Sequence, residues 1–422
     1  MTDVPRYPLF DAERMRVYPR ILVALYTAVA IGIFLWSKNG LDAWGKPLGY
    51  DFITFWSASY LSLKGQAAAA FDAKQIFLAQ RAATPGETIF LWHYPPTFQL
   101  LGAPLSLLPY FASYLLFIGA TLTAFVATTR RLLDDPQAVW LLLASPAVYI
   151  CVLHGQNSFL SAALFAGAIL LIDRRPVLAG VCLGFLAYKP QLGLLLPLAL
   201  AISGQWRVFF STAATALVFA GVSTLVFGVD LWFVFFKDGA VVRQILENGF
   251  LPWEKIPSAF IFLRLLGVPQ TIAYGAQILT ALSVTGIVAV VWRTFGATRL
   301  SFAVLITATM LVPPYIFDYE FAILMVPLAI VASDMIARGA TRPEKTALLV
   351  LYIIPIQIAP VAAAIHLQIG FLALLATLWL AVHRAYLAAP VPKATPCFST
   401  PNQASAASTT ATAPATDASA RL

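Results

Sequence analysis

The segment ILVALYTAVAIGIFLW, residues 21–36, opens a series of apolar segments that decide the fold. Apolar segments suited to crossing a hydrocarbon core of about 30 Å recur through most of the chain. Of its 422 residues, 60% are hydrophobic and 11% are charged, whereas a soluble domain carries roughly 25% charged residues. A soluble protein of this composition would expose apolar patches over much of its surface. The sequence therefore predicts an all-α polytopic membrane protein.

Basic residues between the apolar segments predict the topology. Short loops rich in arginine and lysine stay in the cytoplasm, and Arg14, Arg16 and Arg20 precede the first segment. The later basic clusters fall on the same side if the chain crosses the membrane about 12 times. The predicted spans are 21–36, 110–129, 137–153, 158–172, 176–188, 191–203, 208–227, 271–292, 300–312, 321–335, 346–365 and 368–383. The pair 176–203 is short for two crossings and could instead be re-entrant.

This topology predicts a multi-pass protein of the plasma (inner) membrane with three regions. Residues 1–20 form a cytoplasmic N-terminus, and 21–387 form the transmembrane domain. Residues 388–422 are rich in Ala, Ser, Thr and Pro and predict a disordered cytoplasmic tail. No small-residue cleavage site precedes 21–36, so this segment is interpreted as a retained helix and not as a removed signal peptide.

Charge and cysteine content exclude several other classes. The net charge of +8 comes from the short clusters that orient the spans, so nucleic acid is not an expected partner. Cys151, Cys182 and Cys397 lack the spacing of a metal site or a disulfide framework. We expect no metal and no cofactor.

The loop 37–96 follows the first span and holds the most informative acid. It contains GYDFITFWSASY, residues 49–60, in which Asp51 precedes an aromatic-rich amphipathic run. A carboxylate at the membrane edge could act as general base toward a sugar hydroxyl, with partial burial raising its pKa. The alternative is an ordinary N-cap of the helix that follows, since Asp is a preferred capping residue.

Two further polar groups are predicted on the outer side. His93 and Tyr94, in the sequence HYPP, could contact a phosphate or a sugar, or could be an interfacial anchor before a proline stop. His154, Gln156 and Asn157 offer donors and acceptors for sugar hydroxyls, or form a plain polar turn.

Lys189 and an acidic corner complete the candidate residues. Lys189 joins two short apolar helices and could bind a phosphate as a point charge, or could extend to the outer interface. Asp318, Tyr319 and Glu320 follow two prolines and could bind an acceptor, or could be solvated loop residues.

Signatures of soluble enzymes, including a Walker loop, a GxSxG elbow and HExxH, are absent from the sequence. A lipid-linked activated substrate therefore suits the chain better than a nucleotide sugar. The alternatives are a lipid-linked sugar flippase or transporter, for which broken helices are also expected, and a non-catalytic assembly subunit. The sequence places its polar groups at one face and shows no strong internal repeat, which favours the enzyme.

Several motifs resemble, in order, those of glycosyltransferase family 87, the polyprenyl-phosphate-mannose-dependent α-mannosyltransferases. The motifs are Tyr50-Asp51-Phe52, Trp56-Ser57-Ala58, Tyr60-Leu61, Lys64-Gly65, Phe71-Asp72, His93-Tyr94-Pro95-Pro96, Ala103-Pro104-Leu105, Gly155-Gln156-Asn157, Ala179-Gly180 to Gly184, and Lys189-Pro190. The resemblance covers residues 51–330. Where many members carry a late-loop histidine, this chain has Ile316-Phe317-Asp318-Tyr319-Glu320.

The resemblance implies a GT-C-type bundle with amphipathic helices in two long extracytoplasmic loops, 37–96 and 228–270. It implies inverting transfer of a hexose, with mannose as the family default, from a polyprenyl-phosphate sugar donor. The acceptor would be a lipid-linked or envelope glycan at the extracytoplasmic face of the lipid bilayer. Asp51 matches the general base and Tyr50 a substrate contact, and Lys189 and His154 would meet the lipid phosphate.

Overall fold

The apolar segments form helices throughout the part of the chain that the computed structural model describes, residues 12–133 and 135–388. Within these two ranges there is no strand, and two isolated bridges pair Leu41 with Lys38 and with Pro47. Helices satisfy their own backbone N–H and C=O groups, which hydrocarbon cannot do. The predicted all-α membrane fold is thus confirmed. Residues 1–11 of the predicted N-terminus, residues 389–422 of the predicted tail and Cys397 lie outside the described residues.

Seven helices of the described ranges are long and apolar enough to cross a membrane. They are α1 (Ala12–Trp36), α5 (Tyr110–Leu133), α11 (Trp206–Phe227), α14 (Gln270–Phe295), α16 (Phe321–Arg338), the broken helix made of α17 (Arg342–Ile353), η7 (Ile354–Gln357) and α18 (Ile358–Ile365), and α19 (Ile369–Leu387). Shorter apolar helices are α8 (Ser158–Leu171), α9 (Pro176–Phe185) with η3 (Leu186–Tyr188), η4 (Pro190–Gly193) with α10 (Leu196–Ile202), and α15 (Arg299–Leu311). The total of about 12 crossings stays a prediction.

The predicted span at 137–153 is not one continuous helix but consists of two short helices, and whether it crosses the membrane stays a prediction. These are α6 (Ala138–Leu143) and α7 (Pro146–His154). Pro146 has no N–H and disfavours helical backbone at the preceding residue. Ser145 is accordingly extended, with φ −66° and ψ 130°.

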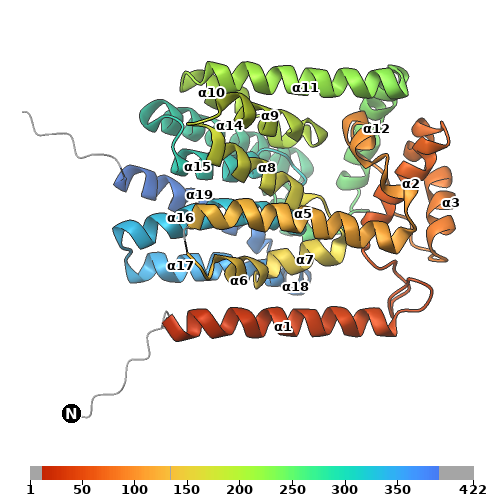
Figure 1. Ribbon diagram of the computed structural model, residues 1–422, viewed down its shortest axis with the longest axis horizontal. Coiled ribbons are helices and arrows are strands. Elements are labelled where there is room, and N and C mark those ends of the chain that lie inside the picture. Colours follow the sequence, from red (N-terminus) through yellow and green to blue (C-terminus); the bar gives the residue numbers. More distant parts are fainter. Residues whose placement is uncertain (1–11, 134, 389–422) are drawn as a thin grey trace, which may run out of the picture. The chain divides into compact units, whose positions relative to one another are not determined.

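The helices of the two long loops gather at one end of the bundle. Figure 1 shows α2, α3 and α12 at the end where α1 finishes and α5 begins. The first loop forms α2 (Phe52–Leu63), η1 (Ala67–Phe71) and α3 (Ala73–Ala83), and α4 (Pro96–Gly102) and η2 (Leu105–Leu107) connect it to α5. The second loop forms α12 (Asp230–Glu247), η5 (Trp253–Lys255) and α13 (Ala259–Leu265). Their position fits the predicted surface helices.

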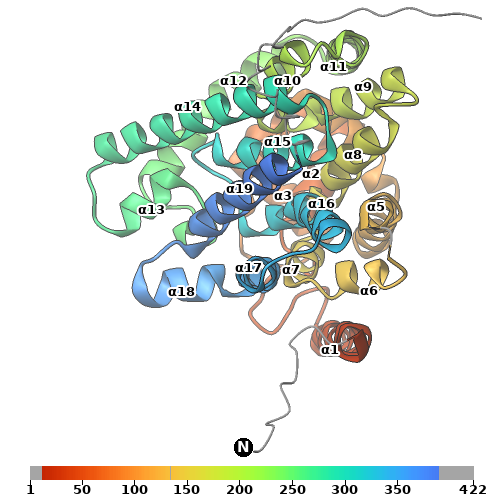
Figure 2. The same ribbon diagram turned by 90° about the vertical axis from the view of Figure 1, so that its left-hand side faces the viewer.

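Burial is very uneven among the membrane helices. In α15, every residue from Leu300 to Leu311 is buried, and most of α16 is buried as well. In the most apolar 18-residue stretch of α1, only 6% of the residues are buried. In the corresponding stretch of the helix that contains α16, 72% of the residues are buried. Figure 2 shows α15 and α16 in the middle of the bundle and α1 at its edge.

Two glycines allow α9 and α11 to pack closely. A Cβ atom on Gly184 would lie 2.5 Å from Thr215 Cβ and 2.7 Å from the Thr212 carbonyl oxygen. A Cβ atom on Gly180 would lie 2.6 Å from Ser211 Cβ. Small residues four apart are a common way for membrane helices to approach, since van der Waals contact drives their association.

We predict that Gly184→Ala destabilises the protein by about 1–3 kcal/mol, because the added methyl overpacks the contact between the helices. Gly221→Ala in α11 is the matched control, since no atom lies within 4 Å of its added Cβ. That change should be neutral or stabilising by about 0.5–1 kcal/mol. Thermal unfolding in detergent measures both variants, and equal behaviour would refute close packing at Gly184.

Candidate active site

Asp51 lies at the start of α2, but its carboxylate does not cap that helix. The backbone has φ −67° and ψ −21°, and the side chain makes no capping hydrogen bond. Instead, Oδ2 accepts a hydrogen bond from Nε2 of Gln156 at 2.8 Å and lies 3.4 Å from Nδ1 of His154. The alternative interpretation of this carboxylate as a helix cap is therefore wrong.

A glycine brings these two segments together. Gly155 ends α7 with φ 62°, in the left-handed region that favours glycine. A Cβ atom here would lie 2.5 Å from Phe52 Cβ and 2.8 Å from the Gly49 carbonyl oxygen. The loop that carries Asp51 therefore lies directly on residue 155, between His154 and Gln156.

His154 lies between Asp51 and a cation. Its Nε2 is 3.4 Å from Nζ of Lys255, which follows Trp253 in the second long loop. Because an ammonium group only donates, Nε2 accepts and the ring proton lies on Nδ1, toward Asp51. The ring lies between two tyrosine rings, with centroid distances of 5.3 Å to Tyr50 and 5.4 Å to Tyr319.

The surroundings of Asp51 favour its ionised form. Burial alone raises the pKa of this carboxyl, but the nearby His154, the Gln156 amide and the Lys255 charge outweigh it and lower the pKa below its ordinary value. The expectation that partial burial would raise this pKa is wrong, because the sequence did not reveal these three partners. Asp51 is thus a carboxylate at neutral pH.

Lys189 belongs to a second, fully buried group. Its ammonium forms an ion pair with Oε1 of Glu320 and donates to Oδ1 of Asn157 at 2.7 Å. Both side chains of this ion pair are less than a tenth exposed. The Lys189 charge is therefore already neutralised within the protein.

Tyr94 and Gln156 connect the two groups. The Tyr94 hydroxyl donates to Oε1 of Gln156 at 3.2 Å, while Nε2 of the same amide donates to Asp51. Nζ of Lys189 lies 5.9 Å from the centroid of the Tyr94 ring. Asp51 and Lys189 thus share a set of neighbours without a direct contact.

His93 lies apart from these two groups, whereas Asp318 lies close to the first. Nδ1 of His93 is 2.8 Å from Oδ2 of Asp238, a residue of α12. Asp318 is buried, accepts from the Tyr319 backbone N–H at 2.8 Å, and is close enough to His154, Lys255 and Asp51 for electrostatic interactions.

Most of the residues singled out from the sequence meet in space. Those in one connected set are Tyr50, Asp51, Tyr94, His154, Gln156, Asn157, Lys189, Tyr319 and Glu320. Asp238, Asp42 and the role of Lys255 were missed. Lys255 stands in Trp253-Glu254-Lys255, and this charged pair beside an interfacial aromatic is the signal that could have found it. Among the residues described, no group of three His, Cys, Asp or Glu could hold a metal ion.

Comparison with known proteins identifies the family. Residues 92–314, more than half of the chain, match the model of glycosyltransferase family 87. A search of curated proteins and a search of solved structures found no match. The match includes His154, Lys189 and Lys255, and it begins after Asp51. The chain belongs to glycosyltransferase family 87 and, with its apolar helices, is a membrane glycosyltransferase.

Proposed function

We propose that this protein transfers a hexose, by family default mannose, from a polyprenyl-phosphate sugar to a lipid-linked or envelope glycan acceptor. The observation that carries the proposal is an ionised Asp51 next to His154 and Lys255, where the loop helices gather. The His154 ring thus lies between a base for the attacking hydroxyl and a cation for a phosphate. Sugar transfer from a lipid phosphate requires both groups.

The charge pattern supports an extracytoplasmic reaction in the plasma membrane. Arg130 and Arg131 are in the last turn of α5, at the opposite end of that helix from the Asp51 loop. Short basic segments remain in the cytoplasm. The Asp51 end is then outside, and both termini are inside.

Each atom in the proposed reaction has a defined destination. The acceptor oxygen forms a bond to the anomeric carbon while the bond from that carbon to the phosphate oxygen breaks. The electron pair leaves with polyprenyl phosphate, and the hydroxyl proton goes to Asp51. Attack opposite the leaving group inverts the anomeric configuration.

Lys255 is the better residue for the leaving phosphate. Lys189 is buried and paired with Glu320, so phosphate binding there would break an existing ion pair. Lys255 is partly exposed, and its ammonium makes a long contact of 3.4 Å with His154. A phosphate monoester is a good leaving group, so neutralisation by one ammonium suffices.

The remaining residues of the set would bind substrate. Tyr94, Gln156 and Asn157 present hydroxyl and amide groups suited to sugar hydroxyls beside the base. Asp318 and Tyr319 lie on the Lys255 side and would contact the acceptor or the leaving group. His93, paired with Asp238, would contact substrate farther from the reacting atoms.

Asp51→Asn should lower kcat by a factor of about 10²–10⁴ while the protein folds normally, because the amide cannot accept a proton. The assay incubates purified protein with polyprenyl-phosphate-mannose and candidate membrane glycolipids and detects a heavier product by mass spectrometry. Asp72→Asn is the control, since Asp72 caps α3 in the same loop. Full transfer by the Asp51 variant would end its assignment as the base.

We expect Lys255→Met to lower activity and Lys189→Met to lower stability. The first should lower kcat by about 10²–10³-fold with little loss of stability. The second leaves Glu320 buried without its partner, at a cost of about 3–5 kcal/mol in unfolding free energy. Adding Glu320→Gln to Lys189→Met should restore stability in the same detergent melts. If Lys255→Met retains full kcat, the phosphate contact lies elsewhere.

Gln156→Leu should move the acid limb of the kcat/KM profile to higher pH. Asp51 works as a carboxylate, and the acid limb reports the loss of that ionised form as the pH falls through its lowered pKa. Without the amide donor the effect of burial remains, so the pKa of the Asp51 carboxyl rises. Gln99→Leu removes a buried amide that bonds Ser62 and Ala67, and should leave the midpoint in place. An unshifted midpoint in the Gln156 variant would contradict the assigned contact.

A further inference from the structure

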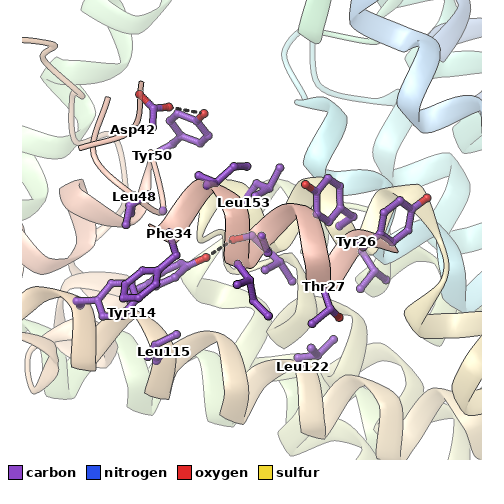
Figure 3. Close-up of a pocket in the computed structure, with 18 of the residues that line it drawn as sticks. Tyr26, Thr27, Phe34, Asp42, Leu48, Tyr50, Tyr114, Leu115, Leu122 and Leu153 are labelled. Atoms are coloured by element: carbon purple, nitrogen blue, oxygen red, sulfur yellow. Dashed lines mark hydrogen bonds between the residues drawn. The ribbon is translucent and has the colours of Figure 1, made fainter. Parts of the chain in front are cut away.

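A cavity of about 400 Å³ lies between α1 and the helices α5 and α7. Figure 3 shows Tyr26 and Thr27 of α1 above Leu115 and Leu122 of α5, with Asp42 and Tyr50 at one end. The walls along its length are almost entirely apolar, whereas Asp42 and Tyr50 make that end polar. The polar end lies at the outer ends of α1 and α5, where the loop helices gather.

Ring contacts hold α1 beside the rest of the protein and leave this space open. Tyr26 stacks on Tyr149 of α7 with ring centroids 4.6 Å apart, and Phe34 stacks on Phe111 of α5 at 5.1 Å. On the α5 side, Leu115 and Leu122 line the cavity. Because both α1 and α5 are membrane-length helices, hydrocarbon and not water surrounds the cavity. An apolar chain therefore suits this cavity better than a polar ligand.

The polar end leads to the candidate active site. The Tyr50 hydroxyl donates to Oδ2 of Asp42 at 2.8 Å, and the Tyr50 ring lies 5.3 Å from the His154 ring. Nδ1 of His154 is 3.4 Å from Asp51. If a lipid chain occupies the cavity, its head group lies at this end, near the His154 ring that contacts the proposed base.

The charges at this end suit a phosphate. Nζ of Lys46 lies 5.8 Å from the centroid of the Tyr50 ring. The Asp42 carboxylate is stabilised by the backbone N–H groups of Trp44 and Lys46, each at 2.9 Å, as well as by Tyr50. Three hydrogen bonds thus satisfy the Asp42 carboxylate, and the exposed Lys46 ammonium can meet an anion.

We propose that this cavity holds the hydrocarbon chain of the lipid-linked sugar donor, with the phosphate near Lys46 and the sugar directed toward Asp51. The inference rests on the proposed function, since it assigns the lipid part of the same substrate. Lys46 would meet the phosphate when the donor enters, and Lys255 would neutralise it when the bond to the sugar breaks.

Two neighbouring residues of α5 give a matched test. Leu115 lines the cavity and is 54% exposed, whereas Leu116 is 61% exposed and does not line it. Leu115→Trp should raise the KM for long-chain polyprenyl-phosphate-mannose about tenfold or more, since the indole fills the space of the chain. It should leave the KM for a short-chain, water-soluble analogue unchanged, and Leu116→Trp should change neither value. Equal effects of the two variants, or equal effects on the two donors, would overturn the proposal.

A binding measurement separates this inference from the transfer reaction. The probe is polyprenyl phosphate with a diazirine in its chain and no sugar, cross-linked to the full-length protein and mapped by mass spectrometry. We expect adducts on peptides of α1, α5 and α7 that unlabelled polyprenyl phosphate displaces and phosphatidylglycerol does not.

Adducts on other helices, or equal displacement by phosphatidylglycerol or by the acceptor glycolipid, would overturn the assignment of the cavity. Adducts at the cavity in a protein that transfers no sugar would support the lipid site and count against the proposed function alone.

Discussion

The close contact between Gly155 and the loop at Gly49 and Phe52 sets the position of Asp51. No room for a Cβ atom remains at residue 155. The end of α7 therefore packs directly against the backbone at the start of α2. As a result, the residues on either side of the glycine, His154 and Gln156, both reach the same carboxylate oxygen. A larger residue at 155 would move the base away from both partners. The chemistry of the site thus depends on a steric requirement of the backbone.

Around this contact, two lysines have different roles because their burial differs. Lys189 is enclosed, and a buried ammonium without a partner would be strongly destabilising, so Glu320 and Asn157 surround it. Lys255 is partly exposed and needs no carboxylate partner to be stable. The first lysine stabilises the packing of the helices near the site, and the second keeps its charge available to an incoming anion. Identical side chains therefore serve structure in one place and chemistry in the other.

Most of the fold could be predicted from the sequence, because long apolar segments in a membrane have few options other than helices. The break at Pro146 was missed, although a proline within a predicted span is a visible warning. The site could be predicted in part. Asp51, His154 and Lys189 were found because polar residues beside apolar segments are uncommon and therefore conspicuous.

The partners of those residues could not be predicted, since they depend on contacts between distant parts of the chain. Lys255 is 101 residues from His154, and Asp238 is 145 residues from His93. For the same reason the direction of the Asp51 pKa was wrong: burial is visible in the sequence pattern, whereas the donors that offset it are not. Lys189 was singled out for a phosphate or for the outer interface, whereas the structure buries it against Glu320, which the sequence showed only as part of an acidic corner.

The peripheral position of α1 has a consequence for how strongly the protein coheres. Contacts that hold it include two aromatic stacks, the hydrogen bond from Arg20 to Gln137 and the guanidinium of Arg20 over the Trp140 ring. Such contacts contribute roughly 0.5–1.5 kcal/mol each, whereas α15 and most of α16 are buried. The first helix therefore packs less closely on the protein than the central helices do. A lipid tens of carbons long would reach the proposed cavity sideways from the bilayer, beside α1, and would not have to be threaded end-first.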